Sequence, residues 1–329
     1  MSQKTQSATR TGHELHIARS ATENAGTNAL ATIHDAGAPR VSVNKAYKMY
    51  VGGAFVRSES GHYFQVTGAA ESADPDVVNI PLGSRKDARD AVLAAKGAWE
   101  AWAARTAFNR GQILYRLAEV MEARREELRA SLVRGGAADE EASREVDLAI
   151  DRTVYYAGFC DKISSLVASH NPVSGPHFGF TIPEPMGVVA IVAPPSPSLL
   201  GLVSTILPVI AGGNTCVVVA SDTDPRTAVV FCECLATSDL PGGVANVLTG
   251  HAKDLAPHLA KHREVMAVDA WIADAELRST LEGEGSGSVK RVKTHDAARA
   301  AALGGEAGQG IGFIERFLEM KTVWHPVGV

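Results

Sequence analysis

The chain has 329 residues, of which 45% are hydrophobic, 21% charged and 6% aromatic, and its formal net charge is -5. This is the composition of an ordinary soluble globular protein. A chain of this length can bury a core without disulfides or a structural metal, which excludes the small stapled scaffolds. Because nucleic-acid recognition depends on clustered Lys and Arg, the mild acidity argues against a nucleic-acid partner.

The cysteines and the apolar segments predict a cytoplasmic protein that has no membrane segment. The four cysteines lie in apolar or helical stretches and form no paired-loop framework, which favours a reducing compartment: Cys160, Cys216, Cys232 and Cys234. The N-terminal segment contains no apolar run that could form a signal-peptide core. The most apolar region, 187–220, is interrupted by prolines and by a Gly-Gly-Asn turn, so it predicts no spanning helix.

The first half of the chain predicts a tail, a hairpin and a helical block. Residues 1–44 are rich in Thr, Ala, Ser and Asn, which predicts a flexible tail. Two β-favouring runs within 47–66 predict hairpin strands. Ser84 and Asp87 can cap the first of three amphipathic helices, the last of which ends near Val167.

After Gly187 the pattern changes to short apolar strands that alternate with helices. The strands are expected at 188–192, 216–219, 244–248 and 265–268. Strand-helix-strand units of this kind form a parallel sheet covered on both faces. Right-handed crossovers then predict a doubly wound, Rossmann-type α/β fold. Asp224 and Pro225 provide an N-cap and a first-turn proline for the helix after the second strand.

Two segments near the C-terminus have a different character. Residues 283–312 contain eight glycines and little periodicity, which predicts a linker or a mobile loop. Residues 313–329 alternate in a β pattern after one helical turn. A terminal strand of this kind needs a sheet to join.

General motifs indicate no site. The chain has no G-x-x-x-x-G-K-[ST] string and no G-x-G-x-x-G after a strand, so neither standard phosphate motif is present. Cys232 and Cys234 could form a metal pair, but no further ligand lies near them in sequence, and core packing is the preferred interpretation. We assign no metal site. His251, His258 and His262 could be aligned by a helix, although the charges around them favour a solvated face.

Long strings in the second half of the chain resemble a known family. In order, they are IPEPMGVVAIVAPPSPSLLGLVSTILPVIAGGNTCVVVASDTDP, DLPGGVANVLTG and LAPHLAKHREV. With TAFNRGQILYRLAEVMEARREEL before them and EMKTVW near the C-terminus, they resemble the cofactor-binding half of the NAD(P)-dependent aldehyde dehydrogenases. The resemblance implies a cofactor-binding domain over 45–282, a Gly-rich linker over 283–312 in place of the catalytic domain, and an oligomerisation strand over 313–329.

The chain departs from this family where the chemistry should lie. The family oxidises an aldehyde by thiolate attack, oxyanion stabilisation and hydride transfer to nicotinamide. Its nucleophilic Cys and the Glu-Leu-Gly-Gly-Lys stretch that contains the general base should follow Val268, and neither string occurs. We therefore assign no catalytic residue.

Cofactor and substrate contacts also differ. The family's oxyanion asparagine aligns with Ser196, the lysine that bonds the adenosine ribose aligns with Val219, and the Gly-Ser-Thr turn over the pyrophosphate aligns with a stretch containing Trp271. A bulky Trp271 would block close approach of the backbone to a phosphate. We therefore expect NAD(P) binding to be weakened and assign no cofactor firmly. The remaining candidate cofactor-binding residues are Ser196, Ser221, Thr249 and Gly250.

Within the superfamily, DRTVYYAGFCDKI, NPVSGP, ATSDLPGGV and LEMKTVWHPVG resemble the second, non-catalytic module of the family-sixteen aldehyde dehydrogenases. The resemblance implies a catalytically silent subunit that assembles with a full-length aldehyde dehydrogenase, or with itself, through its terminal strand. The expected interface residues are Phe317, Met320, Lys321, Val323 and Trp324.

Two other functions stay open. The first is an NAD(P)-dependent aldehyde oxidoreductase with divergent or partner-supplied catalytic residues. The second is a sensor that binds a small ligand in the vestigial pocket, near Glu184, Ser196 and Thr249.

Overall fold

The four predicted apolar strands form the parallel centre of a seven-stranded sheet. They are β7 (Val188–Val192), β8 (Thr215–Val219), β9 (Ala245–Leu248) and β10 (Val265–Trp271). Every residue of β7, β8 and β9 is buried, because helices cover both faces of the sheet. The antiparallel strands β1 (Met49–Val51) and β2 (Ala54–Val56) extend one side and β11 (Arg291–His295) extends the other, in the order β11-β10-β7-β8-β9-β1-β2.

The computed structural model describes residues 43–68 and 77–328. The chain divides into two units, Met1–Lys45 and Ala46–Val329, and every described sheet and helix belongs to the second. Apart from its last residues, the predicted tail over 1–44 lies outside the described residues. No helix in the described ranges combines the length and apolarity that a bilayer crossing requires.

Alternate residues of the central strands enter two hydrophobic cores. In β7, Val188 and Val192 face one core, whereas Val189 and Ile191 face the other. The first core is closed by α2 (Arg85–Ala103), α9 (Ala252–Lys261) and α10 (Ala275–Ser286). The second is closed by α3 (Ala107–Ala123), α4 (Arg125–Arg134), α5 (Asp139–Phe159), α7 (Ser198–Ala211), α8 (Pro225–Thr237) and α11 (Ile311–Glu315). The prediction of a doubly wound α/β fold is confirmed.

The predicted helix starts are also present. Ser84 and Asp87 form a capping box on α2, in which each side chain accepts a hydrogen bond from the other residue's backbone N–H. Asp224 caps α8 through the backbone N–H of Thr227, with Pro225 in the first turn. These local signals are read correctly from sequence because each is completed within a few residues.

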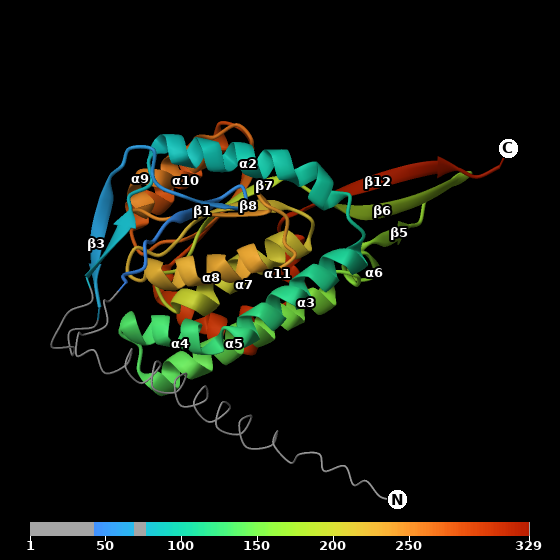
Figure 1. The fold of residues 1–329 in the computed structure, drawn as a ribbon. Coiled ribbons are helices and arrows are strands. Elements are labelled where there is room, and N and C mark those ends of the chain that lie inside the picture. Colours follow the sequence, from blue (N-terminus) through green and yellow to red (C-terminus); the bar gives the residue numbers. More distant parts are fainter. Residues whose placement is uncertain (1–42, 69–76, 329) are drawn as a thin grey trace, which may run out of the picture. The chain divides into compact units, whose positions relative to one another are not determined.

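Two small sheets lie beside the main one. Strands β3 (Tyr63–Thr67) and β4 (Val77–Pro81) form an antiparallel pair. After α6 (Ile163–Val167), the strands β5 (Ser169–Asn171), β6 (His177–Pro185) and β12 (Leu318–Pro326) form a three-stranded sheet in the order β12-β6-β5. Figure 1 shows β6 and β12 projecting away from the main sheet.

The prediction of a Gly-rich linker over 283–312 is wrong. Strand β11 lies in this segment and pairs in parallel with β10, from Arg291 opposite Ala267 to His295 opposite Trp271. Two short 3₁₀ helices follow, η1 (Ala297–Gly304) and η2 (Glu306–Gly308). The buried Arg152 holds both of them by donating hydrogen bonds to backbone carbonyls. Glycine content gave the wrong prediction because this segment is fixed by contacts distant in sequence.

Candidate functional site

The carboxyl ends of β7, β8, β9 and β10 lie at one edge of the sheet, where a doubly wound fold binds its ligand. Ser196 follows β7 and is exposed. Ser221 follows the neighbouring β8, and its Oγ donates to the carbonyl oxygen of Pro195 at 3.3 Å and lies 2.6 Å from Thr223 Oγ1. The structure therefore brings the Ser196 loop and Ser221 together, but the Ser221 hydroxyl is already engaged.

The two candidates after β9 make structural contacts. Thr249 is 1% exposed, and its Oγ1 donates to the carbonyl oxygen of Pro81 at 2.6 Å. Gly250 has φ +139°, and a Cβ built there would lie 3.2 Å from the backbone nitrogen of Gly83. Both residues thus secure the connection between β4 and α2. Glu184 lies elsewhere, on β6, where it pairs with Lys321.

Carboxylates occupy the helix N-termini at this edge. Glu145 Oε1 accepts from the backbone N–H groups of Leu199 and Leu200 at 2.7 and 3.0 Å, at the start of α7. Asp274 caps α10 through the N–H groups of its first turn, at 2.9 and 3.3 Å. Asp224 caps α8 in the same way. The backbone N–H groups at these helix starts are the donors that a bound phosphate would need. Because a carboxylate already occupies each helix start, a second anion there would be repelled.

The end of β10 is filled by an aromatic ring. Trp271 is 8% exposed and stacks on His295, with ring centroids 4.2 Å apart and an interplanar angle of 11°. His295 Nε2 lies 2.8 Å from Asp269 Oδ1, and the indole packs against Leu303 of η1. The Gly-Ser-Thr turn of the family would lie here. Together with the carboxylates at the helix N-termini, the indole fills this edge of the sheet with negative charge and an aromatic ring.

All four thiols are in the core. Cys160, Cys216, Cys232 and Cys234 are each at most 2% exposed. Burial raises the pKa of Cys160, Cys216 and Cys234 to about 12, and it raises the pKa of Cys232 well above its ordinary value. Only a thiolate is an effective nucleophile, so these side chains are inert as placed. Within the described residues, no group of three or more His, Cys, Asp or Glu side chains could hold a metal.

The three predicted histidines do not form one group. His251 is the N-cap residue of α9, and its Nδ1 lies 2.9 Å from Asp222 Oδ2. His258 and His262 lie in the second half of α9 and just after it, beside a cavity next to α2. The three histidines therefore do not share one binding site.

Most of the predicted interface residues are exposed on β12. Trp324 is 62% exposed, Met320 43% and Val323 39%, and the side chain of Lys321 is 62% exposed. Phe317 is an exception, because it is 3% exposed and belongs to the main core, so its assignment to an interface is wrong. It lies at the base of the strand, where the chain is still packed against the sheet.

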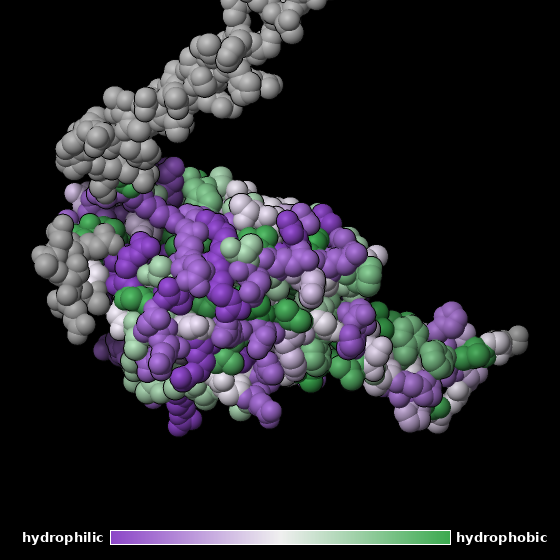
Figure 2. Space-filling view, turned by 60° about the horizontal axis from the view of Figure 1, so that its bottom comes forward, coloured by the Kyte–Doolittle hydropathy of each residue, from purple (hydrophilic) through white to green (hydrophobic). Residues whose placement is uncertain are grey.

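The terminal strand is not alone. It pairs antiparallel with β6 along its whole length, from Leu318 opposite Pro185 to Pro326 opposite His177. Its second edge has no partner strand among the described residues. Hydrophobic residues lie along the projecting strands in Figure 2. Because neighbouring residues of a strand point to opposite faces, Val323 and Trp324 place one exposed apolar side chain on each face of this sheet.

Comparisons with known proteins agree with the fold. The model of the aldehyde dehydrogenase family matches residues 55–271. The chain is 34% identical over 222 residues to hydroxyisobutyraldehyde dehydrogenase of Mycolicibacterium austroafricanum, a match that covers 67% of this chain and 43% of that protein. It is 29% identical over 257 residues to cytosolic 10-formyltetrahydrofolate dehydrogenase of Xenopus tropicalis, covering 77% of this chain and 28% of that protein.

Among solved structures, the NAD-dependent aldehyde dehydrogenase of Sinorhizobium meliloti matches with a TM-score of 0.72 and 26% identity, over 80% of this chain and 52% of that one. The chain thus spans about half the length of such relatives, or less. The predicted family relationship is confirmed: the chain belongs to the aldehyde dehydrogenase family.

Proposed function

We propose that the chain is a catalytically silent aldehyde-dehydrogenase-like subunit, which assembles with a full-length aldehyde dehydrogenase or with a second copy of itself. In the assembly it stabilises or regulates the active enzyme. The observation that carries the proposal is a contrast within one chain. The β12-β6-β5 sheet has an open edge and exposed apolar side chains on both faces, whereas all four cysteines are buried as inert thiols.

The cofactor edge supports catalytic silence. Hydride transfer needs a nicotinamide cofactor, whose pyrophosphate a doubly wound fold binds at a helix N-terminus. Glu145, Asp224 and Asp274 place negative charge at three helix starts, and Trp271 fills the end of β10. We therefore propose that NAD(P) binding is weak or lost in this chain. The four unpaired thiols support a reducing compartment such as the cytoplasm.

The open edge of β12 supports assembly. An unpaired strand edge exposes backbone N–H and C=O groups that a strand of another chain can pair with. Trp324 lies on that strand with 62% of its surface exposed, and large exposed aromatic side chains are typical anchors of interfaces. Burying Trp324 and Met320 against a partner would stabilise the assembly by about 25 cal/mol for each Å² of apolar surface removed from water.

The test measures assembly directly. The chain is purified from its own host by an affinity tag, and co-purifying proteins are identified and counted by mass spectrometry. We expect a full-length aldehyde dehydrogenase near one-to-one, or a homo-oligomer by light scattering. Trp324→Glu should dissociate the assembly. Leu93→Glu introduces the same charge at a 54% exposed leucine of α2 and should leave it intact.

Two results would reject the proposal. The first is a monomeric chain that recovers no dehydrogenase. The second is NAD-dependent aldehyde oxidation by the purified chain alone, which would favour a divergent oxidoreductase instead. Calorimetry with NAD separates these functions further, because an active oxidoreductase must bind the cofactor, whereas a silent subunit need not.

A further inference from the structure

A cavity of about 600 Å³ lies between the first turns of α2 and the second half of α9. Its floor is apolar, because Ala88 and Leu259 are buried beneath it. Its walls carry charge from both helices. Pockets of 300 to 1,000 Å³ are the usual size for small-molecule ligands.

Cationic groups dominate these walls. Arg85, Lys86 and Arg89 come from α2, and Lys261 comes from the end of α9. The single carboxylate in the lining is that of Glu59. The cavity therefore has a local excess of positive charge in a chain whose net charge is -5. His258 and His262 add two imidazole rings beside Lys261.

The contacts that these cations already make would not prevent them from binding a ligand. Arg85 has no hydrogen-bond or ion-pair partner within the described part of the chain, and Arg89 pairs only with the adjacent Asp90 on the helix surface. Lys261 lies 3.4 Å from Glu284, and both side chains are at least 36% exposed. Exposed pairs of this kind contribute little stability, so a ligand could replace them at small cost.

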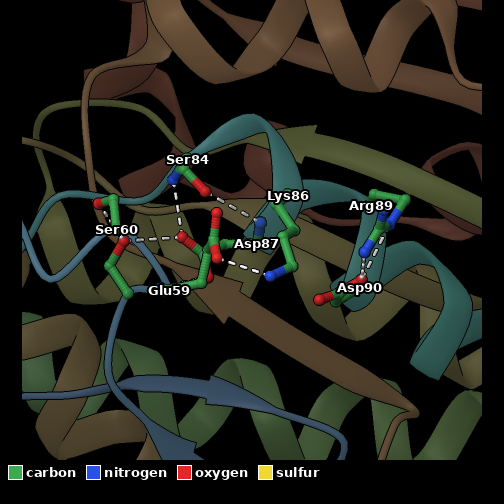
Figure 3. Close-up of polar contacts among 8 residues, drawn as sticks. Glu59, Ser60, Ser84, Lys86, Asp87, Arg89 and Asp90 are labelled. Carbon is green, nitrogen blue, oxygen red and sulfur yellow. Dashed lines mark hydrogen bonds and ion pairs between the residues drawn. The ribbon is translucent and has the colours of Figure 1, made fainter.

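Glu59 is the internal anion of this cavity. Its carboxylate lies 2.6 Å from Lys86 Nζ, and its backbone N–H donates to Asp87 (Figure 3). Asp87 also accepts from the backbone N–H of Ser84 and from the Ser58 hydroxyl. The start of α2 is thus already capped. A ligand would be held by the cationic side chains and not by the helix N-terminus.

We propose that this cavity binds a small anion carrying two or more phosphate groups, which replaces Glu59 as the ion-pair partner of Lys86. Two features favour such a ligand over a single carboxylate. Arg85 and Arg89 lie one turn apart on α2 and face the cavity together, and guanidinium groups match phosphate oxygens in pairs. Lys261 lies on the other wall, so a ligand that uses both walls needs charge at more than one position.

The test is calorimetric titration of the full chain with inorganic triphosphate, orthophosphate and ATP at constant ionic strength. Triphosphate should bind at least about tenfold more tightly than orthophosphate, because it can reach both walls. Glu59→Gln should tighten binding, since it removes the competing carboxylate. Arg85→Glu and Lys261→Glu should each weaken it about tenfold or more.

Arg116→Glu is the matched control, because it reverses an exposed arginine on α3, across the sheet from the cavity. Circular dichroism checks that every variant is folded. Tighter binding of ATP than of triphosphate would identify a nucleotide as the ligand class. The proposal is overturned if no phosphate compound binds at millimolar concentration, or if Arg116→Glu weakens binding as much as Arg85→Glu.

Discussion

Replacing Arg152 tests whether residues 297–308 are an integral part of the fold. Arg152 is 3% exposed, and its guanidinium donates to Ser204 Oγ at 2.7 Å, to the Leu303 carbonyl at 2.8 Å and to the Gly308 carbonyl at 2.6 Å. These contacts join α5, α7 and the two 3₁₀ helices. The variant Arg152→Met keeps much of the side-chain volume and removes every donor.

The expected cost follows from these contacts. Each hydrogen bond to a charged group contributes about 1.5–3 kcal/mol, and the variant leaves two carbonyl oxygens without this donor. The methionine also removes the cost of burying a charge, which offsets part of the loss. We expect Arg152→Met to lower the free energy of unfolding by about 3 kcal/mol. In a unit of this size that corresponds to a fall of roughly 4–6 °C in Tm.

Urea unfolding and limited proteolysis measure the two consequences. The urea midpoint should fall, and a protease should cleave within 297–312 more rapidly in the variant than in the wild type. Arg144→Met is the control, because Arg144 is an exposed arginine on the same helix. A cost below about 1 kcal/mol with unchanged cleavage would show that Arg152 does not hold this segment.

Three further changes test the site. Burial raises the pKa of Glu145, so the wild type loses stability as the pH rises above 4.5 and this buried side chain ionises. Glu145→Gln cannot ionise, and its stability relative to the wild type should therefore increase with pH in paired urea melts. A difference that stays constant with pH would contradict this. Iodoacetamide should modify all four cysteines in urea and none in the native chain, as read by intact mass; native modification would contradict their burial. Trp271→Ala should cost about 3–5 kcal/mol in urea unfolding, and a cost below about 1 would show that the indole is not packed.

The central fold was predictable because its signals are local. A parallel strand covered on both faces must be apolar at nearly every position, and VVAIV and CVVV satisfy this condition without any partner being known. The capping box of Ser84 and Asp87 closes within one helical turn. Signals of this range are complete in a short window of sequence.

Contacts between distant residues were not predictable in this way. Strand β11, with the sequence RVKTH, has one partly buried aliphatic residue, Val292, because it lies at the edge of the sheet. Arg152 is about 150 residues from the carbonyl groups that it binds. The alternation in β12 predicted a strand, but nothing in that segment indicates that β6 of the same chain is its partner.

The cofactor edge depends on the same kind of distant contact. Glu145 satisfies the first N–H groups of α7 from 54 residues away. A carboxylate at a helix N-terminus contributes about 0.3–1 kcal/mol to the fold, and the same charge opposes a phosphate at that position. Stability and dinucleotide binding therefore place opposite demands on Asp224 and Asp274. Under the proposed function, no single replacement restores catalysis, since these charges, Trp271 and the missing reactive thiol are independent obstacles.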